Sequence, residues 1–314
     1  MTWTALPALL AAGAIGVTAV SSTTVFSFAD DRINESSGLV DLGRTMVTTN
    51  DSGGDPLVFV VDSRTGRTLA TTTFTDEVED VEALAPAGDG AVWVGDIGDN
   101  RSRRDSVQVY RVPVGTTDQD VRADSFDLVY PDGAHDAESL LAGPDGRLRI
   151  ITKSLLGGRV YVAPKTLDLD RPNKLVAGPT VDLWATDAAL FPDGKHALVR
   201  GYGAALVTTF PGFQQVGEVV LPDQEQGEGV SIGADGRIRL SSEGQDSEVL
   251  QIKLPAEVRA AMTDAPPPSP AAGLDADGIV DSDHAGGIDW RYVGVGGAGV
   301  VLGWILVRRL RGRR

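Results

Sequence analysis

Short stretches rich in β-branched and aliphatic side chains follow one another along most of the chain, separated by polar or glycine-containing turns. Two consecutive sections show this most clearly. The pattern predicts strands over residues 82–85, 91–95, 107–112 and 125–130, and then over residues 138–142, 147–152, 159–163 and 174–183. Asp-Gly turns stand at the same point of three sections, at residues 144–146, 192–194 and 234–236, and are typical of tight hairpins. The pattern therefore indicates successive four-stranded antiparallel sheets.

Each section opens on a short tag of alternating polar and aliphatic positions. The five tags are Glu35-x-Ser37-x-Leu39, Asp80-x-Glu82-x-Leu84, Asp136-x-Glu138-x-Leu140, Thr186-x-Ala188-x-Leu190 and Gln226-x-Glu228-x-Val230. A repeat of roughly 50 residues built from short strands indicates a β-propeller, in which each repeat forms one blade. The sequence therefore predicts an all-β, five-bladed β-propeller over residues 24–255.

The strand count also predicts how the ring closes. The fifth section ends after its third strand, at residues 248–254, and a spare strand at residues 24–28 precedes the first tag. Pairing the spare strand into the last sheet gives every blade four strands and leaves no long unpaired edge. Six blades are the alternative, if two weak repeats are merged across residues 114–132.

Both ends of the chain are typical of export and membrane attachment. Residues 1–19 have the length and the small residues before a cleavage site that predict a signal peptide, with an uncleaved signal anchor as the alternative. Residues 256–291 form a Pro-rich and acidic linker, and residues 292–307 an uncharged segment that we expect to be a single transmembrane helix. The Arg-rich tail, residues 308–314, then lies in the cytoplasm. We expect a single-pass protein of the cell membrane with an extracytoplasmic propeller.

Composition excludes several classes of function. The chain has no cysteine, which excludes disulfides, thiolate metal sites and cysteine nucleophiles. It has three histidines, of which His284 lies in the predicted linker, so a three-histidine zinc site is not expected. The formal net charge of −16 argues against binding nucleic acid, because phosphate contacts need a basic surface.

Candidate chemistry lies where the blades begin. In a four-stranded blade, the loops before the first strand and after the second converge on one mouth of the central channel. The carboxylates there that we expect to bind metal are Glu35, Glu82, Asp136, Glu138 and Glu228. Carboxylates aimed at one axis repel one another, so either some take up protons or a hard cation, most naturally calcium, neutralises them. The alternative is that individual acids cap backbone N–H groups in the turns.

Cationic groups are expected beside these acids. Lys153 and Arg200 follow second strands, and Asp96 and Asp99 belong to a glycine-rich loop at the same rim. A cation next to bound calcium suits a phosphate- or carboxylate-bearing ligand, so these four residues are the predicted ligand contacts. Salt bridges to neighbouring carboxylates and a solvated hairpin tip are the alternatives.

The tags resemble a known family. Asp80-Val-Glu82-Ala-Leu84, Asp136-Ala-Glu138-Ser-Leu140 and Gly227-Glu228 resemble the blade motifs of β-propeller phytases and of the "esterase-like activity of phytase" family. Residues 34–39 are similar to the first-blade motif of SdiA-regulated propellers. The resemblance implies that Glu82, Glu138 and Glu228 bind calcium and that a bound water attacks phosphate.

This sequence also departs from the phytase pattern. The fourth tag has Thr186 and Ala188 in place of acids, phytases have six blades, and the dense Lys/Arg set that a polyphosphate needs is missing. The first hypothesis is therefore a membrane-tethered module that binds a small-molecule or protein partner on its outer face, with a calcium site. The alternative is a calcium-dependent phosphoesterase or other hydrolase of the phytase-like type.

Overall fold

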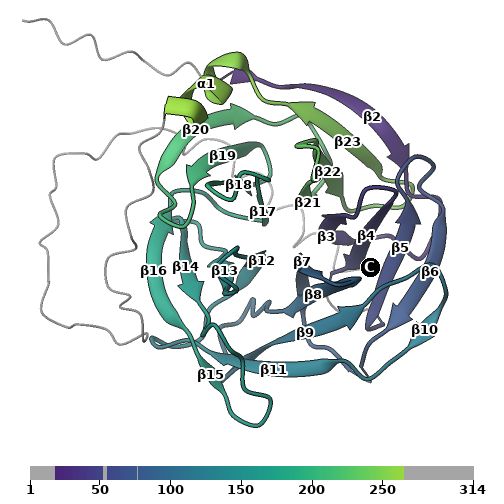
Figure 1. Ribbon diagram of the computed structural model, residues 1–314, viewed down its shortest axis with the longest axis vertical. Coiled ribbons are helices and arrows are strands. Elements are labelled where there is room, and N and C mark those ends of the chain that lie inside the picture. The colour runs from purple at the N-terminus through teal and green to yellow at the C-terminus, as the bar shows by residue number, and fades with distance from the viewer. Residues whose placement is uncertain (1–17, 52–54, 76, 265–314) are drawn as a thin grey trace, which may run out of the picture. The chain divides into compact units, whose positions relative to one another are not determined.

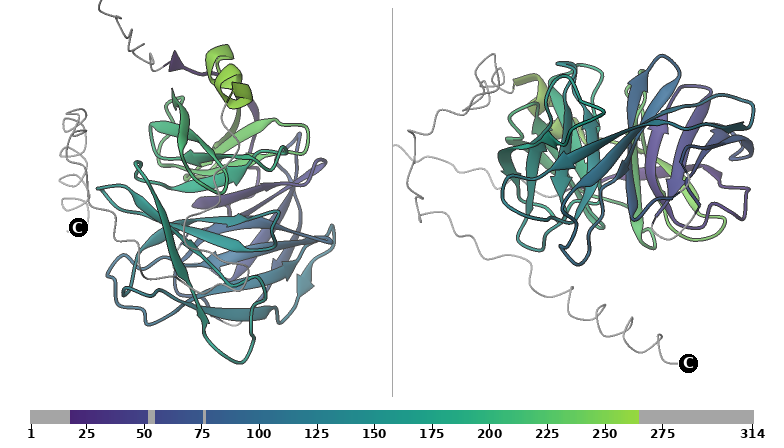
Figure 2. Two further views of the ribbon diagram at one scale, coloured as in Figure 1. Left: turned by 60° about the vertical axis from the view of Figure 1, so that its left-hand side comes forward. Right: turned by 90° about the horizontal axis from the view of Figure 1, so that it is seen from below.

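The described part of the chain forms a ring of five β-sheets. The computed structural model describes residues 18–51, 55–75 and 77–264. Within these ranges the sheets surround a central axis, with their innermost strands nearest to it (Figure 1). The right-hand view of Figure 2 shows the ring of sheets from the side. The predicted all-β, five-bladed propeller is confirmed.

Each blade is built from four antiparallel strands, which follow chain order in the first four blades. The innermost strands are β3 (Ser36–Asp41), β7 (Val81–Gly88), β12 (Ala137–Ala142), β17 (Asp187–Leu190) and β21 (Gly227–Ile232). The second strands are β4 (Thr45–Asn50), β8 (Ala91–Asp96), β13 (Leu148–Thr152), β18 (His196–Arg200) and β22 (Ile238–Ser242). The third strands are β5 (Leu57–Asp62), β9 (Val107–Pro113), β14 (Gly158–Val162), β19 (Ala204–Thr209) and β23 (Glu248–Lys253). The outermost strands are β6 (Thr68–Thr73), β11 (Asp124–Val129), β16 (Val176–Val181), β20 (Gln215–Val220) and β2 (Ser21–Ser27).

The ring closes as the strand count predicts. β2 pairs antiparallel with β23, with Thr23 opposite Gln251, and so supplies the outermost strand of the fifth blade. The segment over residues 114–132, where a sixth blade could have been hidden, holds the two-residue strand β10 (Gln119–Asp120) and then β11. The described residues therefore make five blades and not six.

Three two-residue strands join neighbouring blades. β10 pairs parallel with β6 of the first blade, β15 (Asn173–Lys174) with β11 of the second, and β1 (Thr18–Ala19) with β20 of the fourth. In each case the residues lie just before the outermost strand of the next blade. These connections cover part of an outer edge that would otherwise expose unpaired backbone groups.

The hydrophobic core lies between adjacent blades. The buried apolar residues form five clusters, one for each pair of neighbouring sheets. Between the second and third blades, for example, Phe126 and Val109 pack with Leu140, Ile150 and Tyr161. The innermost strands β3 and β12 are buried along nearly their whole length, whereas β6 and β20 alternate between buried and more exposed positions. Alternation is expected of a sheet with one solvated face.

The structure also differs from the linker prediction. Residues 256–264, which the composition places in the linker, form the helix α1 (Ala256–Asp264). The helix is docked against the fourth blade because Val258 is buried there and Gly217 of β20 leaves room for it; a Cβ at Gly217 would lie 2.9 Å from Val258 Cγ1. Packing of this one apolar side chain therefore outweighs the polar composition of the segment.

The predicted membrane segments lie mostly outside the described residues. Residues 1–17 of the predicted signal segment, the rest of the linker, the apolar segment 292–307 and the tail 308–314 all do so. Thr18 and Ala19, at the end of the predicted signal segment, form β1 against β20. Among the helices of the described ranges, none is long and apolar enough to cross a membrane.

Candidate functional site

The tags place their central side chains at irregular positions of the innermost strands. The pairing of innermost and second strands shifts register around Ser37, Glu82, Glu138 and Glu228, as at a β-bulge. In the fourth blade, where the tag has Ala188, the pairing of β17 and β18 is regular. A bulge changes the direction of a side chain and is common next to functional sites. The three glutamates of the tags therefore share one backbone irregularity at the same end of the channel.

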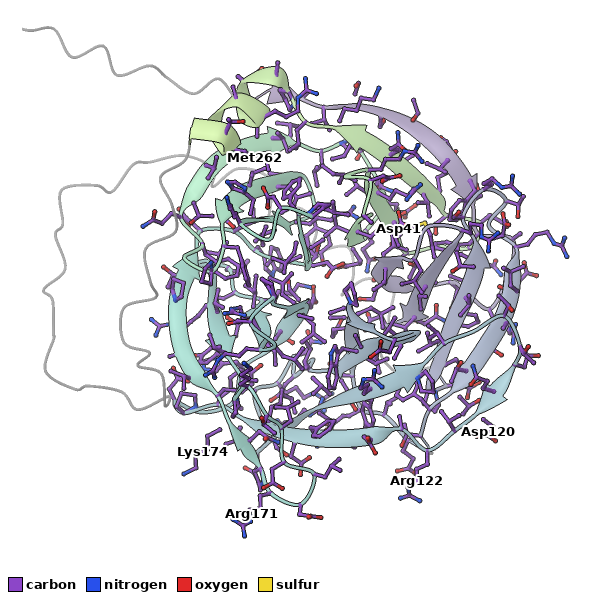
Figure 3. All side chains as sticks on the ribbon, in the orientation of Figure 1. Asp41, Asp120, Arg122, Arg171, Lys174 and Met262 are labelled. Atoms are coloured by element: carbon purple, nitrogen blue, oxygen red, sulfur yellow. The ribbon has the colours of Figure 1, made fainter. Side chains whose placement is uncertain are left out.

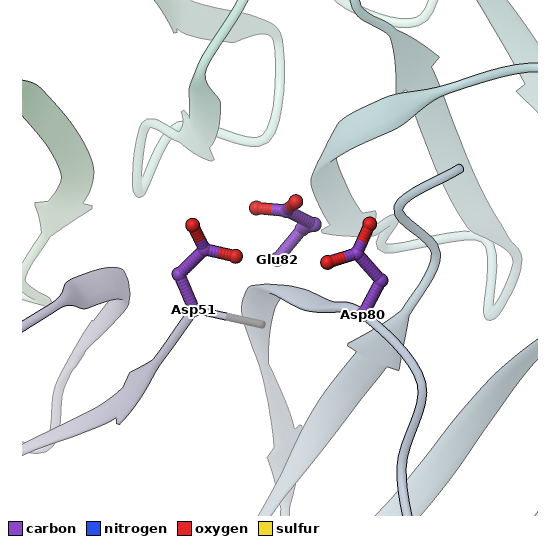
Figure 4. A group of neighbouring side chains, drawn as sticks. All are labelled: Asp51, Asp80 and Glu82. Atoms are coloured by element: carbon purple, nitrogen blue, oxygen red, sulfur yellow. The ribbon is translucent and has the colours of Figure 1, made fainter. Parts of the chain in front are cut away.

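Three carboxylates converge on one side of this mouth. Oxygen atoms of Asp51, Asp80 and Glu82 all lie within 4.8 Å of one another, and their carboxyl groups face a common space (Figure 4). Asp51 follows β4 of the first blade, whereas Asp80 and Glu82 begin the second blade. The acidic group thus bridges two blades. Carboxylate oxygens are the ligands that calcium prefers, and three of them from two blades can adapt to its flexible geometry.

A second group lies across the mouth, around Lys153. The ammonium group of Lys153 contacts Glu138 and lies 3.0 Å from the hydroxyl oxygen of Tyr202. It also stands 5.3 Å and 5.7 Å from the ring centres of Tyr202 and Trp184, which pack edge to face. Carboxylate, hydroxyl and aromatic faces together stabilise the charge of a lysine that is largely removed from water.

Two glutamate oxygens at the mouth have no partner. Within the described ranges, Oε2 of Glu138 and Oε2 of Glu228 are buried and accept no hydrogen bond. Both side chains are at least nine-tenths buried. An unsatisfied buried acceptor costs roughly 1–3 kcal/mol, so these atoms favour binding a proton, a water or a cation.

Burial and mutual repulsion raise the pKa values of the glutamates at the mouth. Burial, with the charges of Glu138, Asp51 and Asp80, raises the pKa of Glu82 well above its ordinary value. Burial, with the charge of Glu228, does the same to the pKa of Glu138. Burial raises the pKa of Glu228 to about 7, although Lys153, Arg200 and a hydrogen bond from Tyr202 act the other way. The mouth therefore holds more carboxyl groups than it can ionise without a further cation.

Glu243 adds a second carboxyl group of the fifth blade to the mouth, beside Glu228. It follows β22, and burial together with the charges of Glu228, Asp51 and Glu35 raises its pKa to about 7. Lys153 responds in the opposite sense: burial alone would lower its pKa, but the charges of Glu138 and Glu228 raise it overall. Lys153 is therefore fully charged at neutral pH and compensates only part of the negative charge at the mouth.

The structure gives the predicted ligand contacts Asp96 and Asp99 local partners. Asp96 accepts from the backbone N–H groups of Glu79 and Asp80 at 3.0 Å and forms an ion pair with Arg104 at 2.6 Å. Asp99 accepts from the backbone N–H groups of Arg103 and Arg104. Both aspartates are buried, and these bonds correspond to the capping alternative for turn acids.

Arg200 also lies away from the mouth's open space. Its side chain is fully buried, and its guanidinium donates to the carbonyl oxygens of Gly229 and Ser241 and to the side chain of Gln224. These contacts join the fourth blade to the fifth. Burial lowers the pKa of Arg200 to about 10, which leaves the group charged at neutral pH. Its position fits a connection between blades better than contact with an outside ligand.

The two remaining predicted metal ligands, Asp136 and Glu35, lie in different surroundings. Oδ1 of Asp136 accepts from the backbone N–H of Asp99 at 2.9 Å, and burial raises the pKa of Asp136. Glu35 is half-buried at the rim of the first blade, close enough to act on Glu243. Of the five predicted metal-binding residues, the structure places Glu82 in the converging acidic group. The partners of Glu82 there are Asp80, which opens the same tag, and Asp51, which follows the second strand of the first blade; neither was among the predicted metal ligands.

Two aromatic residues of the mouth were missed by sequence reasoning. Trp184 and Tyr202 stand on either side of β17 and β18, and both contact Lys153. The only sequence signal is that each lies in a loop at the same end of the fourth blade as the tags. Aromatic residues are common enough in loops that this signal does not select them.

Comparisons with known proteins support no family assignment. No family model matches the chain, and no curated protein matches it. Among solved structures, a glutaminyl cyclase of Myxococcus xanthus covers 76% of this chain and 100% of its own, at 12% identity and a TM-score of 0.48. The PQQ-bound aldose sugar dehydrogenase of Streptomyces coelicolor covers 74% of this chain and 98% of its own, at 14% identity and a TM-score of 0.47. Likeness at this level says nothing about activity. The topology and the mouth define a five-bladed β-propeller with an acidic channel entrance.

Proposed function

We propose that this propeller is a binding module whose channel mouth holds a divalent cation, calcium, and presents it to an anionic group of a ligand. The observation that carries the proposal is the convergence of Asp51, Asp80 and Glu82 within 4.8 Å. The donor set fits calcium because it consists of oxygen atoms and the chain has no cysteine. Bound calcium would supply positive charge, and the three carboxylates would hold it.

The unpartnered oxygens of Glu138 and Glu228 support the same proposal. They lie at the tags of the third and fifth blades, on either side of the two blades that carry the acidic group, so the mouth has acceptor capacity beyond Asp51, Asp80 and Glu82. A water or a ligand hydroxyl that donates to Oε2 of either residue would satisfy it. Trp184 and Tyr202 add an aromatic surface beside them. The ligand class is therefore an oxygen-rich molecule with an anionic group for calcium and hydroxyl groups for the glutamates.

Binding is better supported than phosphoester hydrolysis. A phosphoesterase needs cations that are free to stabilise the charge that develops on phosphate. Lys153 is already bound to Glu138 and Tyr202, and Arg200 is bonded to carbonyl oxygens of the fifth blade. A phytase-like activity remains the alternative hypothesis, and a calcium-dependent turnover of phosphate esters would establish it.

We further propose that the propeller is tethered to the outer side of a cell membrane. The support is the uncharged segment 292–307 followed by the Arg-rich tail 308–314. The measurement is membrane fractionation of cells that express the full chain, followed by protease treatment of intact cells. A propeller recovered in the soluble fraction, or one protected from external protease, would contradict the tether.

Calcium binding is tested by thermal melts of the full-length protein in an uncharged detergent, first with EDTA and then with calcium. A ligand present at 100 times its Kd and bound only to the native state adds about 2.7 kcal/mol, which corresponds to about 5–10 °C in Tm for a domain of this size. The variant Glu82→Gln keeps the shape of the side chain and removes a ligand charge, so we expect its calcium shift to disappear. Asp124→Asn, an exposed carboxylate on β11, is the matched control.

Two results would contradict the calcium proposal. The first is a melt of the unaltered protein that calcium leaves unchanged. The second is a calcium shift that persists in Glu82→Gln at the size seen in Asp124→Asn, because the cation would then bind elsewhere.

A further inference from the structure

A large cavity lies on the face of the propeller opposite to the acidic mouth. Its volume is about 1020 Å³, at the upper limit of small-molecule sites. It is lined by the turn between β17 and β18, the turn between β21 and β22, the end of β23 and the helix α1. Turns between first and second strands lie at the end of the blades away from the mouth. The cavity is therefore separate from the proposed calcium site.

Apolar side chains make up part of the cavity lining. Phe191, Ile252 and Leu254 contribute to it and are largely buried in the core between the fourth and fifth blades. Met262 of α1, whose place is labelled in Figure 3, also belongs to the lining. A methionine side chain is flexible and adapts to ligands of different shape. An apolar ligand segment of moderate size can therefore be removed from water here.

The rim of the cavity is basic. Lys195, Arg237, Lys253 and Arg259 belong to the lining and are exposed. The lining carboxylates are Asp193, which binds His196 at 2.7 Å, and Asp235, which lies 3.3 Å from Arg237. Within the described ranges, the side chains of Lys195, Lys253 and Arg259 form no ion pair.

The basic rim contrasts with the rest of the molecule. The whole chain has a formal net charge of −16, so four cations at one cavity do not reflect the composition of the protein. They come from three elements that are separate in sequence: the β17–β18 turn, the fifth blade and α1. The fold therefore assembles a positively charged opening above an apolar surface.

We propose that this cavity binds an amphipathic anion, with its carboxylate or phosphate head at Lys253, Arg259 and Lys195 and its apolar body against Phe191, Leu254 and Met262. The cations attract the head electrostatically, and the apolar part of the lining favours binding because it removes hydrocarbon from water. A single molecule is the expected occupant because the site is a cavity and not an extended face. The chemistry is shared by free fatty acids and by the head region of anionic lipids.

The test uses octanoate, titrated by calorimetry into the full-length protein in an uncharged detergent with EDTA present, so that the mouth does not contribute. A blank titration into detergent alone is subtracted. Octyltrimethylammonium, which has the same chain and the opposite charge, is the ligand control. We expect octanoate to bind and the cation not to bind. We also expect the affinity for octanoate to fall as salt is added, because the rim is exposed.

Charge reversal at the rim locates the site. The double variant Lys253→Glu and Arg259→Glu replaces two exposed cations by carboxylates, which repel an anionic head, and should weaken octanoate binding by about tenfold or more. Lys174→Glu, on β15 of another blade, is the control and should bind as the unaltered protein does (Figure 3). Met262→Gln tests the apolar surface independently and should also weaken binding. Thermal melts establish that each variant is folded.

The proposal is overturned by any of three results. These are the absence of octanoate binding, equal binding of octyltrimethylammonium, and an affinity that the rim reversal leaves unchanged. A fourth experiment, sedimentation with phosphatidylglycerol vesicles, separates the sources of the ligand. Binding to vesicles without binding of octanoate would show that the protein contacts the membrane surface and does not hold a single molecule in the cavity. This result would also refute the proposal.

Discussion

The acidic mouth makes a sharp prediction about pH. In EDTA, the free energy of unfolding should fall as the pH rises from about 5 to about 8.5. Burial raises the pKa of Glu228 from 4.5 to about 7 in the folded protein. A group with a raised folded-state pKa stabilises the protein fully below its unfolded pKa and loses that contribution as the pH passes its folded pKa. For Glu228 alone, the loss across this range is about 2.5 kcal/mol.

Other groups of the mouth act in the same direction. The raised pKa values of Glu82, Glu138 and Glu243 add further stability at acidic pH that is lost as the pH rises. Carboxylates with depressed pKa values change the free energy of unfolding in the opposite direction, but they do so over a different pH range. Asp30, whose pKa is lowered to about 2 by Arg32, loses its contribution only as the pH falls below about 4. The fall in the free energy of unfolding between pH 5 and 8.5 is therefore due to the buried acids.

The assay is urea denaturation followed by tryptophan fluorescence at several pH values, with EDTA and then with calcium. Glu228→Gln cannot ionise, so it should have a smaller pH slope and be more stable than the unaltered protein at pH 8.5 in EDTA. Asp124→Asn should keep the full slope. Because protons and calcium compete for the same oxygens, calcium should stabilise more at pH 8.5 than at pH 5. A stability that is flat or rises between pH 5 and 8.5, or a full slope in Glu228→Gln, would refute the reasoning.

Three further predictions concern the fold. Arg200→Met should lower the free energy of unfolding by about 2–4 kcal/mol, because the carbonyl oxygens of Gly229 and Ser241 lose a charged donor inside the protein. The measurement is urea denaturation, and an unchanged midpoint of the denaturation curve would contradict this prediction. Leu140→Ala should cost about 2–5 kcal/mol in the same assay, because Leu140 is fully buried between the second and third blades. Deletion of residues 21–27 removes β2 and leaves the edge of β23 unpaired, so we expect self-association in size-exclusion chromatography, and a monomeric product would show that the ring does not depend on this closure.

The candidate site could be predicted from the sequence only in part. The tags placed Glu82, Glu138 and Glu228 at the channel mouth because a repeat fixes where each blade begins. Whether an acid faces the channel or caps a turn depends on backbone geometry that the repeat does not specify. Asp96 and Glu82 are both acids at the mouth end of the second blade, yet the first accepts backbone N–H groups and the second faces other carboxylates.

The blade pattern was predictable because it is local. Alternation of apolar and polar residues, Asp-Gly turns and the repeat period determined the strands of the second and third blades to within about two residues at most ends, and counting them determined that β2 closes the ring. Contacts between distant segments were decided only by the tertiary structure. These include the pairing of Arg200 with the fifth blade, the meeting of Asp51 with Asp80, and the docking of α1 over Gly217. Short-range patterning determines secondary structure, whereas the chemistry of both candidate sites depends on side chains brought together by the closure of the ring.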